Sequence, residues 1–295
     1  MPPKKIIQVT NLTCAYGDFI AVDQLSFHVN QGEIYALLGT NGAGKTTTLE
    51  TLEGHRAPTR GEVTIFDEAP GSLSARRRTG TMLQESGFAG ELTVKETVAL
   101  MGKLSGRHDD VEAVVEKSLL GHKMNTKVAQ LSGGEKRRLD FATAIFGSPE
   151  LIFLDEPTNA LDPESRAALW QTVMELNQQG STIVLTTHYL EEAEAHADRI
   201  GLIHAGRLAH EGTLAELIAQ FPASISLEAA PQVVFPERFG FERNGTRWVA
   251  AVDDLQTRLY EVLLWAENNN VPLTQIKAQP STLNDVFHTL AQERS

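Results

Sequence analysis

The sequence has little cysteine, no long apolar run and no excess of basic residues. Cys14 is the only cysteine among 295 residues, so an intramolecular disulfide is excluded and a reducing compartment is favoured. No apolar run approaches the roughly 20 residues of a membrane-spanning helix, and no apolar signal core follows residues 1–5. We therefore expect a cytosolic protein without direct membrane insertion, which a partner could still hold at a membrane.

The charge balance argues against a protein that coats nucleic acid. The 26 basic side chains are outnumbered by 38 acidic ones, which gives a formal net charge of -12. Neutralising a phosphate backbone needs clustered Lys and Arg. Two basic runs, at residues 76–78 and 136–138, are interpreted as exposed helix faces rather than nucleic-acid sites. The sequence therefore predicts no nucleic-acid partner.

Nearly continuous apolar runs occur at residues 33–38, 151–154 and 182–185, each ended by small or polar residues. Such runs are typical of strands buried on both faces of a parallel sheet. Residues 6–10 and 27–29 instead predict antiparallel strands, because short β-branched and aromatic stretches are separated there by a turn signal.

Helices are predicted between the buried strands. Asp162 and Pro163 suit the cap and first position of a helix whose apolar stripe continues to Gly180. Residues 91–146 show helical periodicity and no convincing strand, which predicts a mostly helical insertion. The expected fold class is α/β, a mostly parallel sheet flanked by helices with an antiparallel β subdomain.

The chain length suggests about two domains, and the sequence pattern changes at residues 221–222. We expect the first domain over residues 1–222 and a small α+β accessory domain over residues 223–295. In the accessory domain we predict strands at 246–252 and 272–277 and helices at 253–268 and 281–292, the first helix turning Leu255, Leu259, Val262, Leu263 and Ala266 inward. Nothing in it has the spacing of a catalytic or metal site.

A glycine-rich stretch follows the first buried strand and precedes a helix. Glycines let the backbone wrap closely enough for N–H groups to face phosphate oxygens, and the helix N-terminus adds partial positive charge. In this loop Lys45 is predicted to reach the β- and γ-phosphates, and the Thr46 hydroxyl to ligate Mg²⁺. The alternative is a turn that binds nothing. The predicted nucleotide-binding residues here are Gly39, Thr40, Asn41, Gly42, Ala43, Gly44, Lys45, Thr46 and Thr47.

Two adjacent carboxylates, Asp155 and Glu156, end the second buried strand. They are costly to hold there unless a cation or hydrogen bonds compensate them. Mg²⁺ would compensate Asp155, which leaves Glu156 to orient and polarise the water that attacks the γ-phosphorus. The alternative makes Asp155 a turn former and Glu156 a solvated surface acid.

A third motif is Ser132-Gly133-Gly134-Glu135. Ser132 and Glu135 have capping-box spacing, which the start of a helix alone explains, whereas consecutive glycines suit close approach of a helix N-terminus to an anion. The ordered set of motifs resembles that of an ABC transporter ATPase subunit over about residues 5–220, in the order 39–46, Gln84, 131–135, Asp155-Glu156, 159–162 and His188.

The resemblance implies ATP and Mg²⁺ as ligands and a homodimer that sandwiches each nucleotide between two chains. Ser132, Gly133 and Gly134 of one chain, with Glu135 in the same motif, would approach the γ-phosphate held by Lys45 of the second copy.

The resemblance also implies roles for four isolated residues. Tyr16 would stack on adenine, with a strand aromatic in a small core as the alternative. Gln84 would touch Mg²⁺ and the attacking water and relay to a membrane partner. Asp162 would signal across the dimer while also capping its helix, and His188 would contact the γ-phosphate.

Segments 83–87, 92–97, 186–194, 198–200 and 283–287 resemble the bacterial drug- and antibiotic-exporting branch of that family. This implies that the homodimer docks under a separate polytopic membrane permease at the cytoplasmic face of the inner membrane. A soluble ABC ATPase acting on a nucleoprotein target and an importer subunit are the alternatives. The single cassette disfavours the soluble class, and the short second domain disfavours an importer, so an exporter is expected.

Overall fold

The computed structural model describes residues 3–83 and 87–292, with side chains up to residue 287. The chain forms two compact units, Met1–Thr213 and Leu214–Ser295. The division lies ahead of the expected boundary after residue 222. Helix α8 (Leu214–Ile218) contacts α10 (Leu283–Gln292), and the Ser281 hydroxyl donates to the Phe221 carbonyl at 3.0 Å, so the intervening segment belongs to the second unit.

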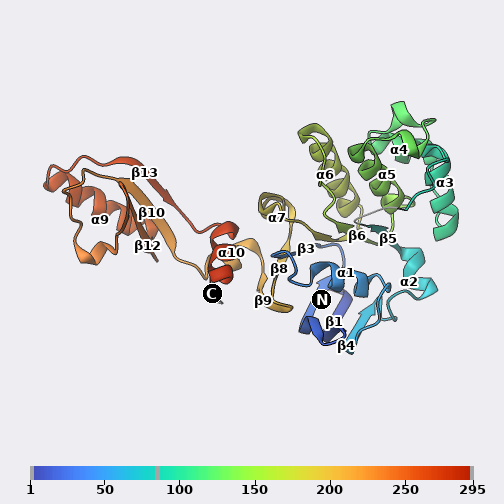
Figure 1. The fold of residues 1–295 in the computed structure, drawn as a ribbon, viewed down its shortest axis with the longest axis horizontal. Helices are drawn as coiled ribbons and strands as arrows, with labels where there is room; N and C mark the ends of the chain where they lie inside the picture. Colours follow the sequence, from blue (N-terminus) through green and yellow to red (C-terminus); the bar gives the residue numbers. More distant parts are fainter. Residues whose placement is uncertain (1–2, 84–86, 293–295) are drawn as a thin grey trace. The chain divides into compact units, whose positions relative to one another are not determined.

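The first unit is built on a mixed six-stranded sheet (Figure 1). Its strand order is β5-β6-β7-β3-β8-β9, parallel except for β9, which pairs antiparallel with β8. Every residue of β3, β6 and β7 is buried, which confirms the prediction of strands covered on both faces. The strands are β3 (Ile34–Gly39), β5 (Thr79–Met82), β6 (Leu151–Asp155), β7 (Thr182–Thr186), β8 (Arg199–His204) and β9 (Arg207–Gly212).

A separate three-stranded antiparallel sheet has the order β2-β1-β4. Its strands are β1 (Lys5–Tyr16), β2 (Phe19–Asn30) and β4 (Arg60–Ile65). The first two are longer than the sequence predicts, because bulges let the pairing continue through irregular positions. Their apolar faces share one core with residues of β3 and α1 (Lys45–Leu52), so this sheet packs beside the glycine-rich loop.

The predicted helical insertion consists of α3 (Val94–Ser105), α4 (Val111–Lys117) and α5 (Gly133–Ile145), with short 3₁₀ turns at Gly121–Lys123 and Val128–Gln130. The three helices contact one another and lie together in Figure 1. The other helices of the unit are α2 (Leu73–Arg78), α6 (Pro163–Gln178) and α7 (Leu190–His196).

The second unit holds a four-stranded antiparallel sheet of order β11-β12-β10-β13, packed against α9 (Leu255–Asn268) around an aromatic cluster. The strands are β10 (Ala223–Glu228), β11 (Glu242–Asn244), β12 (Arg247–Val252) and β13 (Thr274–Gln279), and a 3₁₀ turn spans Glu237–Phe239. One prediction for α9 is wrong: Leu263 is 41% exposed, whereas Val262 and Ala266 are buried. A helix turns about 100° per residue, so with Val262 and Ala266 at the centre of the buried face, Leu263 lies at its edge, toward solvent.

Within the described ranges, none of the helices is long and apolar enough to cross a membrane.

Candidate nucleotide site

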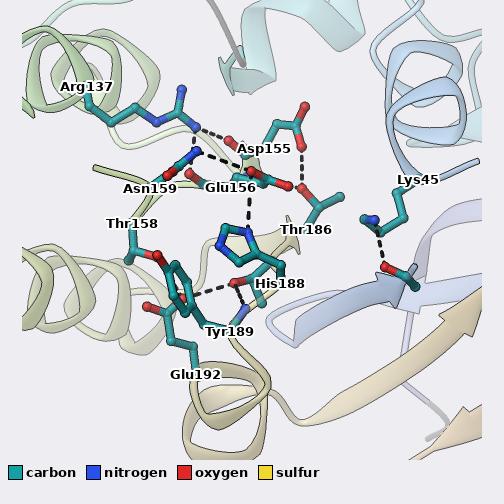
Figure 2. A network of polar contacts seen from close by, with 12 residues as sticks. Lys45, Arg137, Asp155, Glu156, Thr158, Asn159, Thr186, His188, Tyr189 and Glu192 are labelled. Atoms are coloured by element: carbon teal, nitrogen blue, oxygen red, sulfur yellow. Dashed lines mark hydrogen bonds and ion pairs between the residues drawn. The ribbon is translucent and has the colours of Figure 1, made fainter. Parts of the chain in front are cut away.

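Three neighbouring parallel strands end beside one another at the candidate site. Strand β7 lies between β6 and β3, so the carboxyl ends of these strands share one edge of the sheet. The glycine-rich loop follows β3, Asp155 ends β6 and Thr186 ends β7. Figure 2 shows the side chains of Lys45, Glu156 and His188 gathered at this edge. The crevice outside the carboxyl ends of parallel strands is where open α/β sheets bind ligands.

The loop conformation requires glycine at two positions. Gly44 caps α1 with a left-handed φ of 103°, and a Cβ there would lie 2.5 Å from the Ala21 carbonyl oxygen. A Cβ on Gly39 would lie 2.4 Å from the Ile203 carbonyl oxygen. The loop therefore leads directly into the N-terminus of α1, whose first N–H groups lack intrahelical acceptors and favour an anion.

The Lys45 ammonium folds back onto its own loop. It donates to the carbonyl oxygens of Gly39 at 2.8 Å and Thr40 at 3.2 Å. Burial lowers the pKa of Lys45, while the negative charges of Glu156 and Asp155 oppose that shift. The cation is thus held beside two carboxylates at the mouth of the loop, where it can exchange carbonyl partners for phosphate oxygens.

Asp155 is a buried carboxyl, only 6% exposed. Burial raises its pKa, and a hydrogen bond from the Thr186 hydroxyl to its Oδ1 acts in the opposite direction. This hydroxyl also accepts from the Glu156 N–H at 3.1 Å. Thr186 therefore ties both carboxylate residues to the end of β7, a role that its place in an apolar strand does not predict.

Glu156 has a left-handed backbone, with φ of 47°. A non-glycine residue in that region is strained by about 1–3 kcal/mol, and such strain clusters at functional sites. Its N–H donates to the Thr186 carbonyl at 3.0 Å, and its Oε2 lies 3.5 Å from His188 Nδ1. The backbone turn directs the carboxylate out of the sheet edge toward His188 (Figure 2).

These groups border a cavity of about 660 Å³. Its volume is within the range of small-molecule sites. The predicted residues that line it are Tyr16, Asn41, Gly42, Gly44, Lys45, Thr46, Thr47, Glu156 and His188. Phe19 and Ala21, which were not predicted, complete the lining. Gly39, Thr40 and Ala43 belong to the same loop without lining the cavity, and Gln84 lies outside the described residues.

A family model described as "ABC transporter" matches residues 22–159. The Nod factor export ATP-binding protein I of Burkholderia lata is 40% identical over 223 residues, which cover 73% of each chain. The chain belongs to the ABC transporter family. The protein of the same name from Burkholderia thailandensis is 38% identical over 258 residues, which cover 81% of this chain and 83% of the relative.

Solved structures agree with this assignment. An ATP-binding subunit of an ABC transporter, 29% identical, superposes with a TM-score of 0.68 over 73% of this chain and 92% of its own. A dimeric ATP-binding cassette bound to ADP and Pi, 27% identical, gives 0.65 over 70% and 98%. The chain is therefore the ATP-binding subunit of an ABC transporter, and the mixed sheet with its flanking helices is the ABC ATPase fold.

In this ABC ATPase, Tyr16 lies at the cavity rather than in a core. It is 45% exposed, its hydroxyl is 3.3 Å from Thr47 Oγ1, and the Arg56 guanidinium lies 3.9 Å from its ring centroid. The small-core alternative is wrong. An aromatic ring with one open face at the rim of the cavity suits stacking on a planar base.

The Ser132–Glu135 motif begins α5 as a capping box. The Ser132 N–H donates to Glu135 Oε2 at 2.8 Å, and the Glu135 N–H donates to Ser132 Oγ at 3.3 Å. Ser132 and Gly133 are exposed, and no residue of the motif lines the Lys45 cavity. Asp162 likewise caps α6, accepting from the Ser165 N–H at 2.9 Å, outside that cavity.

The reading of residues 136–138 as one exposed basic face is wrong at Arg137, which is 8% exposed. Its guanidinium donates to the carbonyl oxygens of Asp155, of Glu156 at 2.8 Å and of Leu83 at 2.6 Å. Figure 2 shows it reaching from α5 to the two carboxylate residues. Arg137 therefore connects the helical insertion to the end of β6, an arrangement that no local pattern indicates.

Glu192 holds the backbone next to His188, a role that no local pattern in the sequence indicates. Its Oε2 accepts from the Thr158 hydroxyl at 2.9 Å and the Thr187 hydroxyl at 3.2 Å, while Oε1 lies 3.5 Å from Arg166 Nε. Thr158 follows the carboxylate pair and Thr187 precedes His188. One buried carboxylate thus holds together the two segments that present Glu156 and His188.

Proposed function

We propose that the chain is the ATP-hydrolysing subunit of an exporter, with Glu156 as the residue that activates water. The observation that supports this most is the strained Glu156 beside His188, in one cavity with Lys45. Water attacks the γ-phosphorus in line, the new P–O bond forms as the bond to ADP breaks, and the Glu156 carboxylate takes the proton. The relatives named for Nod factor export support the direction of transport.

Mg²⁺ fits the residues at this edge. The buried Asp155 carboxyl, whose pKa is raised by burial, would be stabilised as an anion by a neighbouring cation. In the part of the chain that the structure describes, no group of three His, Cys, Asp or Glu residues could hold a metal. Mg²⁺ does not require such a group, because it binds through one or two protein oxygens and the substrate phosphates. Asp155, Thr46 and Gln84 are the proposed ligands, and the bound ion would neutralise phosphate charge.

We propose a homodimer with shared sites, because Ser132 and Gly133 are exposed and neither they nor Gly134 line the Lys45 cavity. In a second copy they would complete that cavity from the opposite side, offering the N-terminus of α5 to the γ-phosphate. The similar cassette solved as a dimer with ADP and Pi supports the arrangement. Asp162, exposed at the start of α6, would lie at the same interface.

A shared site predicts that the ATPase rate per chain rises with protein concentration until the dimer is saturated. The rate should be measured at saturating Mg-ATP over a wide dilution series, beside sedimentation of the same samples. A rate per chain that stays constant while sedimentation shows only monomers would contradict the shared site.

Lys45→Ala should weaken ATP binding by about tenfold or more, because a charge-assisted hydrogen bond to phosphate contributes about 1.5–3 kcal/mol. Titration with a fluorescent ATP analogue measures the affinity. Lys117→Ala removes an exposed lysine of α4 and should bind as the parent does. Parent-like affinity in Lys45→Ala would remove the lysine from its proposed role.

We propose that a membrane permease docks in a second cavity of about 710 Å³, at α2, the end of β5 and α3. Here called the docking cleft, it exposes apolar side chains, with Leu73 76% and Leu104 72% exposed. Exposed apolar side chains gathered in a cleft are typical of a protein-binding site. Leu83 also lines the cleft, and its carbonyl oxygen accepts a hydrogen bond from Arg137. A docked helix would therefore contact the segment that leads to Gln84.

The partnership is tested by purifying the tagged chain from detergent-solubilised membranes of its own host and identifying the co-purifying proteins. We expect one polytopic membrane protein in equal amount, which would place the chain at the cytoplasmic face of the inner membrane. A matched purification of a variant with Leu104→Glu in the cleft should recover less of it. Recovery of ribosomal or DNA-repair proteins instead would move the function to the soluble class.

A further inference from the structure

A buried acid lies at the docking cleft. Glu53 follows the last residue of α1 as its C-cap, and its side chain is only 3% exposed. Its Oε1 has no hydrogen-bond partner, and its Oε2 has His55 Nε2 at 3.7 Å, beyond hydrogen-bond distance. Buried carboxyl oxygens are almost always hydrogen-bonded, so an orphaned one calls for an explanation.

The isolated chain holds this carboxyl at an energetic cost. Burial raises the pKa of Glu53 to about 8, and the negative charges of Asp155 and Glu50 act in the same direction. A glutamine would fill the same volume without that penalty. A cation delivered from outside would convert the penalty into a charge-assisted hydrogen bond.

The end of α1 favours the same kind of ligand. The C-terminus of a helix carries partial negative charge, so a cation next to Glu53 is also attracted by the helix dipole. Helix α1 begins at Lys45 and ends at Leu52, and eight residues span only about 12 Å. A charge bound at Glu53 therefore acts on the helix that carries the phosphate-binding loop.

The other charges of the cleft have the opposite sign. Arg76, Arg77 and Lys103 line it and are exposed, and in the described part of the chain none of them forms an ion pair. Arg107 also lines it, and its guanidinium donates to the carbonyl oxygens of Thr143 and Ala144. A permease segment that enters the docking cleft would therefore meet basic side chains at its surface and the acidic Glu53 beneath them. The complementary partner is a helix with acidic residues on its flanks and one basic residue at the tip.

We propose that Glu53 binds a Lys or Arg side chain that the permease inserts into the docking cleft, and so selects permeases with that basic residue. This inference rests on the proposed permease partnership. Pairing at Glu53 joins a docked permease to the phosphate-binding helix by one hydrogen bond. The rim cations Arg76, Arg77 and Lys103 orient the acidic flanks of the same segment.

The contact is located first. Leu104→Cys places a thiol on the wall of the cleft, and the native Cys14 is buried, so a benzophenone maleimide labels position 104 selectively. The labelled chain is irradiated with the polytopic membrane protein that co-purifies with it, and the cross-linked peptide is sequenced. We expect a cytoplasmic segment of that protein containing a Lys or Arg.

The pairing is then measured with the same two proteins in liposomes. Glu53→Gln should reduce permease-stimulated ATP hydrolysis by about tenfold or more, since breaking a buried charged pair commonly exceeds the 1.4 kcal/mol of a factor of ten. Hydrolysis by the chain alone should stay at the parent rate. Glu50→Gln removes a more exposed acid of the same helix, paired with Arg56, and should keep the stimulation.

Reversing the charges of both partners distinguishes a lost ion pair from a misfolded variant. Glu53→Lys alone should abolish stimulation, and exchanging the cross-linked Lys or Arg of the permease for Glu should restore it. Two outcomes would overturn this inference and leave the permease proposal standing. One is a cross-link to the membrane protein with parent-like stimulation in Glu53→Gln, and the other is a cross-linked segment without Lys or Arg. Absence of any cross-link to that protein overturns the proposed docking cleft, and this inference with it, while the co-purification still tests the partnership.

Discussion

Glu156→Gln should reduce ATP turnover by about 10²- to 10⁴-fold, the usual contribution of a positioned general base. The amide keeps the size of the side chain and the left-handed backbone, with its N–H still bound to Thr186. It loses only the ability to accept a proton from water. Lys45 and the loop remain intact, so ATP affinity should stay at the parent value.

A variant that binds ATP without hydrolysing it should also accumulate the closed dimer. Size-exclusion chromatography with Mg-ATP should show Glu156→Gln as a dimer under conditions in which the parent elutes as a monomer. Glu175→Gln, an exposed acid of α6, is the matched control and should turn over as the parent does. Parent-like hydrolysis by Glu156→Gln would exclude Glu156 as the base.

Arg137→Met should destabilise the first unit by about 3 kcal/mol or more. The carbonyl oxygens of Leu83, Asp155 and Glu156 lose their guanidinium donor, and each buried acceptor left unsatisfied costs about 1–3 kcal/mol. Methionine fills most of the space left by the aliphatic stem, so lost packing contributes little. ATP turnover should fall with stability, because the Glu156 carbonyl loses an anchor.

Urea unfolding followed by circular dichroism measures this change, and the ATPase rate is read well below the transition. Lys136→Met, on the adjacent exposed position of α5, should stay within about 0.5 kcal/mol of the parent. Arg137→Lys should lie between the two, because an ammonium cannot reach all three carbonyls in the planar fork of a guanidinium. Equal stability of Arg137→Met and Lys136→Met would show that the three contacts contribute nothing.

Much of the candidate site could be predicted from the sequence because its signals are local. The glycine-rich loop needs backbone freedom at Gly39 and Gly44, and both are positions where a Cβ would collide with a carbonyl oxygen. The cap residues Ser132 and Asp162 bond within their own first helical turns, as their spacing predicts. Buried strands were recognisable because both of their faces are apolar.

The sequence by itself determined the phosphate-binding loop, the carboxylate pair that ends β6, the caps of α5 and α6, and the family to which this set of motifs belongs. Only the tertiary structure decided which charged side chains are buried. Arg137 lies in a basic run and Glu192 beside another acid, so nothing within a few residues of either marks it. Their hydrogen-bond partners come from other strands and helices, as does the cleft beside Glu53. The cost of burying a charge depends on these distant neighbours, and no local pattern can encode them.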